Sequence, residues 1–166
     1  MTCKDAMLNI IKRQTEGLMY HDEMTDYYAF LNLGMLKKLH KKQTEEELEA
    51  LRKAKCTYIS AFGMIPFYIA EDPRAIPLDW KNKTNSEIDE ATLQFLAQTS
   101  LSDYLKWEED TCEIYKASAE TLKEHMNFHL YRKVCDMIED VQKEICNINN
   151  ILLDAALYNY CPSYFK

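Results

Sequence analysis

Polar side chains interrupt lines of residues spaced three and four apart, which is the spacing of one helix face. They are Gln14 and His21 in the first predicted helix, His40, Gln43 and Glu47 in the second, and Glu108, alone in an otherwise apolar line, in the third. A carboxylate on a buried helix face is costly unless it is paired, hydrogen-bonded or bound to a metal ion. Two carboxylates and an imidazole are a donor set that suits iron, manganese or zinc. We therefore expect Glu108 to have a polar partner, and a metal ion is one candidate.

Two predicted turns decide which of these side chains can meet. His21 lies thirteen residues before Gly34 and Glu47 thirteen after it, so a tight turn at Gly34 would place them at one level. A second turn at Asn127 would bring two polar residues of the last helix to within about one turn of Glu108. The candidate metal ligands are therefore His21, Glu47, Glu108, Gln142 and Glu144.

Helices must position these residues. The chain of 166 residues has only 3 Gly and 4 Pro, which argues against a turn-rich β fold. Three of the prolines, Pro66, Pro73 and Pro77, exclude a regular helix between two helical regions. Apolar periodicity predicts one helical domain over 1–166, with a hairpin at about 3–63, a crossover at 66–85, a short helix at 86–98, a second hairpin at about 101–157 and an aromatic tail at 158–166.

The sequence allows two positions for the turn between the first two helices. Thr44 and Glu47 form the pattern of a capping box, which would start a helix near Thr44 and leave Glu47 solvated. A turn at Gly34 gives two helices of about 30 residues each, which match in length. We adopt the turn at Gly34.

Link lengths predict the topology of an all-α four-helix bundle. Tight turns make each helix pair an antiparallel hairpin. A link of about 20 residues reaches about 66 Å when extended, which exceeds the ~45 Å length of a 30-residue helix. Two hairpins joined by one such crossover form the ferritin-like arrangement.

The second hairpin resembles the matching hairpin of ferritin heavy chains. The similarity runs without a gap from residues 107–110 through 129–130 to 141–142. The resemblance implies that Glu108 takes the place of the iron-ligand glutamate of the third helix. It implies in the same way that Gln142 takes the place of the glutamine near the second iron.

The first hairpin resembles ferritin less closely. Residues 43–50 look like the segment that carries a bridging glutamate and a ligand histidine, with Glu47 as the glutamate and Ala50 in place of the histidine. His21 stands where the first helix of the family has a ligand glutamate. The resemblance implies a ferritin-like protein that binds one Fe, Mn or Zn ion in the bundle core. Because the ligand set is incomplete, we do not expect full di-iron oxidase or storage activity.

Hydrogen bonding without a metal is the alternative interpretation of the same residues. His21 would then be a core histidine bonded to Glu47 or a tyrosine, and Glu108 would bond to Tyr115, Tyr28 or Gln142. His40 lies in a run of lysines and is expected at the surface. The protein would in that case be a metal-free assembly or partner-binding helical module, of a kind that resembles proteins of phages or mobile elements.

Composition restricts the partners and the compartment. A net charge of −7 without a basic helix face disfavours nucleic acid. The six cysteines form no C-x-x-C pair, the N-terminus shows no signal segment, and no run is long and apolar enough to predict a membrane span. We therefore expect a cytoplasmic protein with reduced thiols. The aromatic tail needs a surface to cover, so we expect a homo-oligomer, dimer or larger, or a protein partner.

Overall fold

The computed structural model describes residues 1–73 and 83–166. It contains four long helices, which are α1 (Cys3–Phe30), α2 (Gly34–Phe62), α3 (Glu90–Glu124) and α4 (Phe128–Leu157). A 3-10 helix, η2 (Asn85–Glu87), precedes α3, and a short helix, α5 (Pro162–Phe165), follows α4. The predicted all-α class is confirmed, and the described residues contain no strand. Within them, no helix has the length and apolar character that crossing a membrane requires.

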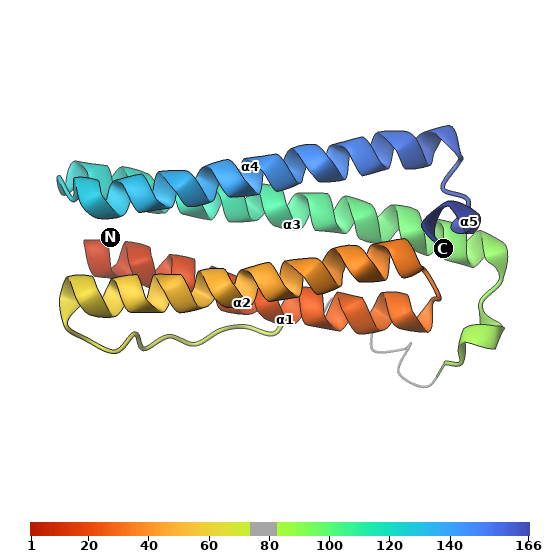
Figure 1. Ribbon diagram of the computed structural model, residues 1–166, viewed down its shortest axis with the longest axis horizontal. Helices are drawn as coiled ribbons and strands as arrows, with labels where there is room; N and C mark the ends of the chain where they lie inside the picture. The colour runs from red at the N-terminus through yellow and green to blue at the C-terminus, as the bar shows by residue number, and fades with distance from the viewer. Residues whose placement is uncertain (74–82) are drawn as a thin grey trace.

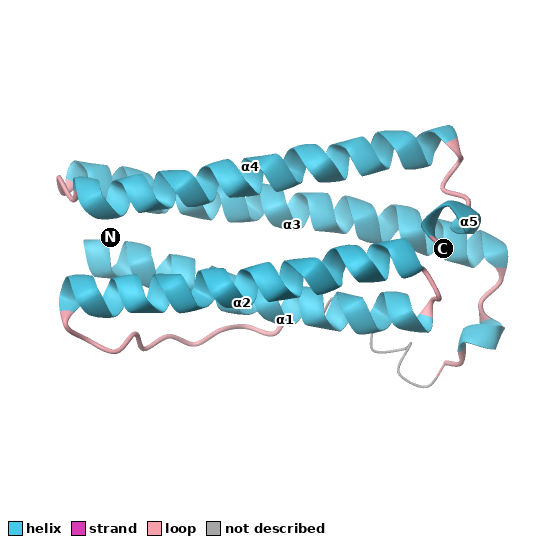
Figure 2. Ribbon diagram, in the orientation of Figure 1, coloured by secondary structure: helices cyan, strands magenta, loops and turns pink. Residues whose placement is uncertain are grey.

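The four long helices lie side by side as an elongated bundle (Figure 1). In this view α1 and α2 form one layer and α3 and α4 the other, and each helix of a pair runs opposite to its neighbour. α1 packs along α2, α3 packs along α4, and α1 forms the main contact between the pairs. The chain leaves α2 at one end of the bundle and enters α3 at the other (Figure 2). Residues 74–82 of the predicted crossover lie outside the described residues.

The turn between α1 and α2 is close to the predicted one. Asn32 adopts a left-handed backbone with φ 59°, and the N–H of Leu33 donates to the carbonyl of Tyr28 at 3.0 Å. This is a common way to end a helix, and Asn tolerates the left-handed conformation. Gly34 therefore begins α2 and does not terminate α1. Thr44 lies inside α2, where its hydroxyl donates to the carbonyl of His40 at 3.0 Å, so the alternative turn at Thr44 is wrong.

The second helical pair differs from the prediction at its start. The sequence suggested a short helix over 86–98 and a break near Thr99 and Ser100, but α3 runs unbroken from Glu90 to Glu124. The hydroxyl of Thr99 donates to the carbonyl of Phe95 at 2.9 Å, and the hydroxyl of Ser100 to that of Ala97 at 3.3 Å. Hydroxyl groups that bond to the preceding turn can remain within a helix. That is why these two residues do not interrupt α3.

The aromatic tail folds back onto the bundle. Phe165 in α5 is completely buried in an apolar cluster with Leu33, Leu36 and Leu101. Tyr164 stacks on Tyr158 with ring centroids 5.2 Å apart. The tail therefore covers the end of the bundle where α1 turns into α2.

Two apolar clusters fill the ends of the bundle. One includes Tyr28, Leu101 and Phe165 near the α1–α2 turn. The other includes Ile10 and Leu122 near the α3–α4 turn. The buried ionisable residues Glu16, His21, His40 and Glu108 lie along the helices between the two ends of the bundle.

Candidate functional site

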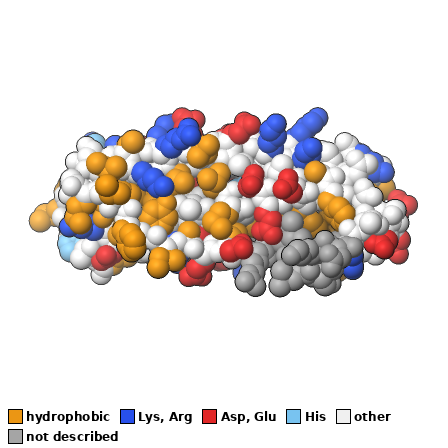
Figure 3. All heavy atoms as spheres, turned by 90° about the horizontal axis from the view of Figure 1, so that it is seen from below, with side chains coloured by type: hydrophobic (Ala, Val, Ile, Leu, Met, Phe, Trp, Pro, Cys, Tyr) orange, Lys and Arg blue, Asp and Glu red, His pale blue; other side chains and the backbone are white. Residues whose placement is uncertain are grey.

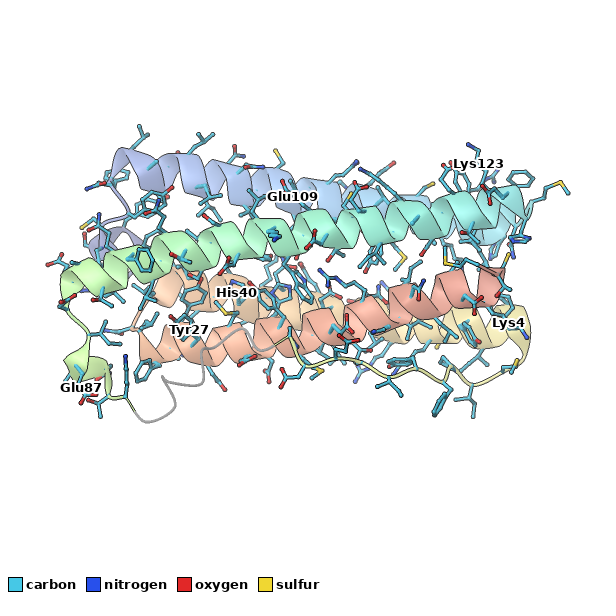
Figure 4. All side chains as sticks on the ribbon, turned by 180° about the vertical axis from the view of Figure 1, so that it is seen from behind. Lys4, Tyr27, His40, Glu87, Glu109 and Lys123 are labelled. Atoms are coloured by element: carbon cyan, nitrogen blue, oxygen red, sulfur yellow. The ribbon has the colours of Figure 1, made fainter. Side chains whose placement is uncertain are left out.

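Two histidines meet in the middle of the bundle. His21 of α1 and His40 of α2 are both completely buried, and their Nδ1 atoms lie 2.9 Å apart. Because a hydrogen bond needs one donor, one ring carries a proton on Nδ1 and the other does not. The Nε2 atom of each ring is buried and lacks a hydrogen-bond partner among the described residues. Tyr20 and Tyr104 pack against both rings, and Figure 4 shows His40 between the helices.

Glu108 of α3 faces this pair. Its side chain is 4% exposed, and its Oε1 lies 3.6 Å from Nε2 of His21. That distance is too long for a hydrogen bond. It is close to the ~3.4 Å that separates a nitrogen and an oxygen bound to one tetrahedral metal ion through bonds of about 2.1 Å.

Glu47 of α2 contributes a second carboxyl group, which lines the same groove as Glu108 and interacts with its charge. Its stem is partly exposed, but its Oε2 is buried and has no hydrogen-bond partner among the described residues. The carboxylate packs against Gly17 of α1, where an added Cβ would lie 3.4 Å from Cδ of Glu47. A glycine in the interior of a helix lowers its stability, and here an added Cβ would only make ordinary van der Waals contact with the carboxyl group.

Arg13 is the cation nearest to the two carboxylates, but it is engaged elsewhere. Its Nε donates to the hydroxyl of Thr111 and its NH2 group to the carbonyl of Trp107, both at 2.8 Å. The guanidinium carbon lies 3.4 Å from the centre of the Trp107 ring. Among the described residues no ion pair joins Arg13 to Glu108 or Glu47. Neither carboxylate is therefore neutralised by direct contact with a side-chain cation.

His21, His40, Glu47 and Glu108 form what we call the polar layer, and their surroundings disfavour the charged forms of these side chains. Burial, and to a smaller extent the charge of Glu108, raises the pKa of Glu47 to about 8. Burial raises the pKa of Glu108 to about 7, although Arg13 opposes the rise. Burial and the charge of Arg13 lower the pKa of His21 to about 3, and burial lowers that of His40 well below its usual range. Near neutral pH the imidazoles are uncharged, Glu47 holds its proton and Glu108 is about half protonated, and a bound cation would displace these protons.

A groove between α2 and α4 gives access to this layer. It has a volume of about 1050 Å³, and Gln14, Glu47, Glu108 and Tyr115 belong to its lining. The charged lining comprises seven acidic side chains and four lysines. With Glu47 and Glu108 ionised the groove is acidic, and it then suits a cationic ligand better than an anionic one. Its size is at the upper limit of sites that bind small molecules.

The two predicted ligands from α4 do not join the buried layer. Gln142 is exposed, because it lies on the outer side of α4 relative to the groove-lining residues Val141 and Glu144. Glu144 is half-buried in the groove wall and accepts a hydrogen bond from the Tyr104 hydroxyl at 2.9 Å. Gln142 is therefore not among the residues that line the groove, whereas Glu144 is, and the predicted metal role of both stays a prediction.

Sequence reasoning also misplaced His40. The neighbouring lysines suggested a surface position, but the ring is buried against His21. The spacing of Leu36, His40, Gln43 and Glu47 in steps of four, three and four contained the signal, because these positions share one face of α2. Gly17 and Arg13 had no comparable signal, since their roles depend on contacts with Glu47 and Trp107.

The residue of α1 that faces Glu47 lies about one helical turn from the predicted one. The α1–α2 turn is centred on Asn32, so Glu47 faces Gly17 and not His21. His21 meets His40 instead. Among the described residues, no group of three or more His, Cys, Asp or Glu side chains lies close enough to hold a metal ion. His21, Glu47 and Glu108 are thus neighbours that do not yet converge.

Comparisons of the chain with protein-family models, with curated proteins and with solved structures found no match in any of the three. The resemblance to ferritin-like proteins therefore remains a prediction from the residues quoted above.

Proposed function

We propose that the chain is a ferritin-like bundle of two antiparallel hairpins that binds one divalent cation, Fe, Mn or Zn, in its polar layer. Glu108 and His21 would be the first two ligands, and Glu47 the third. The observation that carries the proposal is a set of buried polar atoms that lack hydrogen-bond partners among the described residues and lie close to a groove lined by Gln14, Glu47 and Glu108.

The unpaired atoms have the chemistry of cation ligands. Glu47 Oε2, Gln14 Oε1 and His21 Nε2 are buried and lack hydrogen-bond partners among the described residues. All three can offer a lone pair, and leaving such atoms unpaired costs about 1–3 kcal/mol each. A single cation or an ammonium group would satisfy several of them together.

The His21–His40 pair supports a ligand role for His21. A metal-bound histidine commonly donates its other ring N–H to a neighbouring group, which fixes the tautomer. If Nδ1 of His21 donates to Nδ1 of His40, the lone pair of His21 Nε2 points toward Glu108. His40 would then be the residue that orients His21.

The two-metal site of the family does not fit this chain. Ala50 replaces the histidine that the resemblance requires, and Gln142 is exposed. Three ligands do not yet converge in the described residues, so binding requires the carboxylate of Glu47 to turn from Gly17 toward Glu108. In the metal-free protein burial raises the pKa of both carboxyl groups, so a bound ion would displace their protons. A bound ion would neutralise both and could act there as a Lewis acid.

Metal content tests the proposal. The protein is purified without chelator, reconstituted anaerobically with ferrous iron, manganese or zinc, and analysed for its metals. We expect about one ion per chain, and a melting temperature that rises with metal concentration. Glu108→Ala should lose both effects.

Glu109→Ala provides the matched control, because Glu109 is the exposed neighbour of Glu108. It should retain the ion and the thermal shift. A wild-type protein that remains metal-free after reconstitution with all three metals would overturn the proposal. Equal loss in both variants would show that the bound ion does not lie in the buried layer.

A further inference from the structure

The segment after α2 presents a row of large apolar side chains to solvent. Ile65, Phe67 and Ile69 are 84%, 84% and 76% exposed. The alternate residues, Pro66 and Tyr68, face the bundle and are partly buried. This alternation is that of an extended chain, in which successive side chains point to opposite faces. We call residues 64–70 the apolar strap.

Contacts on the inner side fix the strap to α1. The hydroxyls of Tyr68 and Thr15 are hydrogen-bonded at 2.9 Å. Just beyond the strap, the N–H of Glu71 donates to Oε1 of Glu16 at 3.0 Å, and the Glu71 carboxylate lies 3.1 Å from the amine of Lys12. These contacts hold one side of the strap against α1, so Ile65, Phe67 and Ile69 point to solvent.

The exposed area is large for a monomer. The three outward side chains expose on the order of 500 Å² of apolar surface, at the upper end of the patches that monomeric proteins carry. Ile59 at the end of α2 and Met64 are also exposed, by 45% and 49%. Figure 3 shows hydrophobic side chains gathered on one half of the face that the strap crosses. Such a patch indicates an interaction surface.

We propose that the strap is the interface of a symmetric dimer, in which the outward row of one copy packs face to face on that of a second copy. Ile65 and Ile69 are equally far from Phe67, so an antiparallel pair places Phe67 on the two-fold axis. Each Ile65 then meets the Ile69 of the other copy, which is the self-complementary contact that two-fold symmetry requires.

Charge and area favour a second copy over other occupants. Residues 64–70 carry no charge, so an identical strap meets no repulsion there. The net charge of −7 disfavours an anionic membrane or nucleic acid. Two outward rows with Ile59 and Met64 bury somewhat more than ~1,000 Å² in total, the lower limit for a specific interface. The dimer is therefore weak, with a Kd on the order of 10 µM.

Sedimentation velocity between about 1 µM and 1 mM tests the dimer. The wild-type protein should pass from monomer to dimer over this range. Phe67→Glu should raise the Kd by at least 100-fold, because two carboxylates would meet at the two-fold axis. Leu157→Glu is the matched control, since Leu157 is 82% exposed on α4, far along the chain from the strap, and it should dimerise like the wild type.

Several outcomes would overturn the dimer. A wild-type monomer at 1 mM would do so, as would a dimer of unchanged Kd in Phe67→Glu. Equal loss in Leu157→Glu would mean general hydrophobic association. Flotation of a monomeric wild type with phosphatidylcholine vesicles, abolished by Phe67→Glu, would assign the strap to a membrane surface instead. No strap residue lines the α2–α4 groove, so Glu108→Ala should dimerise normally whether or not the cation proposal holds.

Discussion

The ends and the middle of this bundle are built in opposite ways. At one end Leu33, Leu101 and Phe165 pack without exposure, and at the other Ile10 and Leu122 do the same. Burial of apolar side chains there stabilises the fold at about 25 cal/mol per Å². The layer between the ends instead holds unpaired carboxyl, amide and imidazole atoms, each of which lowers stability.

The contrast indicates where the sequence serves stability and where it serves function. A bundle of this size could fill its middle with leucine, which is often neutral or stabilising relative to buried charged groups. The layer instead combines a glycine beside Glu47 with a histidine pair beside Glu108. Sites that depart from the best packing are candidates for function. The following predictions test whether the ends and the middle respond as differently as their structures suggest.

The largest effect is expected at an apolar end. Phe165→Ala removes a completely buried ring from the cluster at the α1–α2 turn. Truncation of a buried Phe costs about 3–5 kcal/mol, and the loss should appear in the midpoint of urea unfolding. Leu157→Ala, at a position that is 82% exposed, should change stability by less than about 0.5 kcal/mol. A loss below about 1 kcal/mol for Phe165→Ala would mean that the tail is not docked in solution.

The middle should make the metal-free protein sensitive to pH. Unfolded Glu47 loses its proton near pH 4.5, whereas folded Glu47 keeps it up to about pH 8. Between these values the unfolded state binds fewer protons at Glu47, so this group makes stability fall as pH rises. The buried His21 and His40, whose pKa values are lowered, have the opposite effect below pH 6.5. The net fall is therefore expected between about pH 6.5 and pH 8, and it levels off above that range. We expect a decrease on the order of 1–3 kcal/mol in chelated protein, measured by urea unfolding.

Glu47→Gln should reduce this fall, because it removes one of the two titrating carboxyl groups and keeps the shape, while Glu108 still contributes. Glu46→Gln, next to it on the exposed face of α2, should leave the profile unchanged. Stability that rises between pH 6.5 and pH 8 in the chelated protein would contradict the assignment of Glu47 as a buried acid.

Removal of the histidine pair should weaken cation binding without unfolding the protein. His40→Leu keeps an apolar side chain against Tyr104 and deletes the hydrogen-bond partner of His21. Loss of a partner that orients a metal ligand typically costs 10–100-fold in affinity. Calorimetric titration with the metal identified by elemental analysis should show this loss, with a melting temperature of the metal-free protein close to that of the wild type. His125→Leu, at an exposed position, should bind as the wild type does.

The helices were the predictable part of the fold. Apolar spacing placed four long helices, because repeated burial of one face leaves a strong periodic signal. The continuity of α3 through Thr99 and Ser100 was missed, since hydroxyl residues favour helix ends as well as bonds to the preceding turn. The start of α2 was found from helix lengths, although Asn32 and not Gly34 takes the left-handed conformation.

The site was predictable only in part. Glu108 and His21 could be assigned to the interior because each interrupts an apolar face, and both are buried. The partners could not be assigned, because a shift of two residues in the centre of a turn moves the facing position on the next helix by about one turn. That shift brings His40 to His21 and Gly17 to Glu47. On α4 the same uncertainty made Gln142 and Glu144 equally plausible, and only the second lines the groove.

The smallest expected effect is at Gly17, and it tests how closely the middle layer fits. An added Cβ would lie 3.4 Å from Cδ of Glu47 and 3.6 Å from its Oε1, which is ordinary van der Waals contact. Replacing a glycine inside a helix by alanine stabilises it by about 0.5–1 kcal/mol. We therefore expect Gly17→Ala to raise the urea midpoint slightly and to leave metal content unchanged. If the substitution instead destabilises the protein by more than about 1 kcal/mol, the Glu47 carboxyl group cannot move to accommodate the added methyl group. The double variant Gly17→Ala with Glu47→Ala identifies the cause, because removing the carboxyl group should then restore the full gain from alanine.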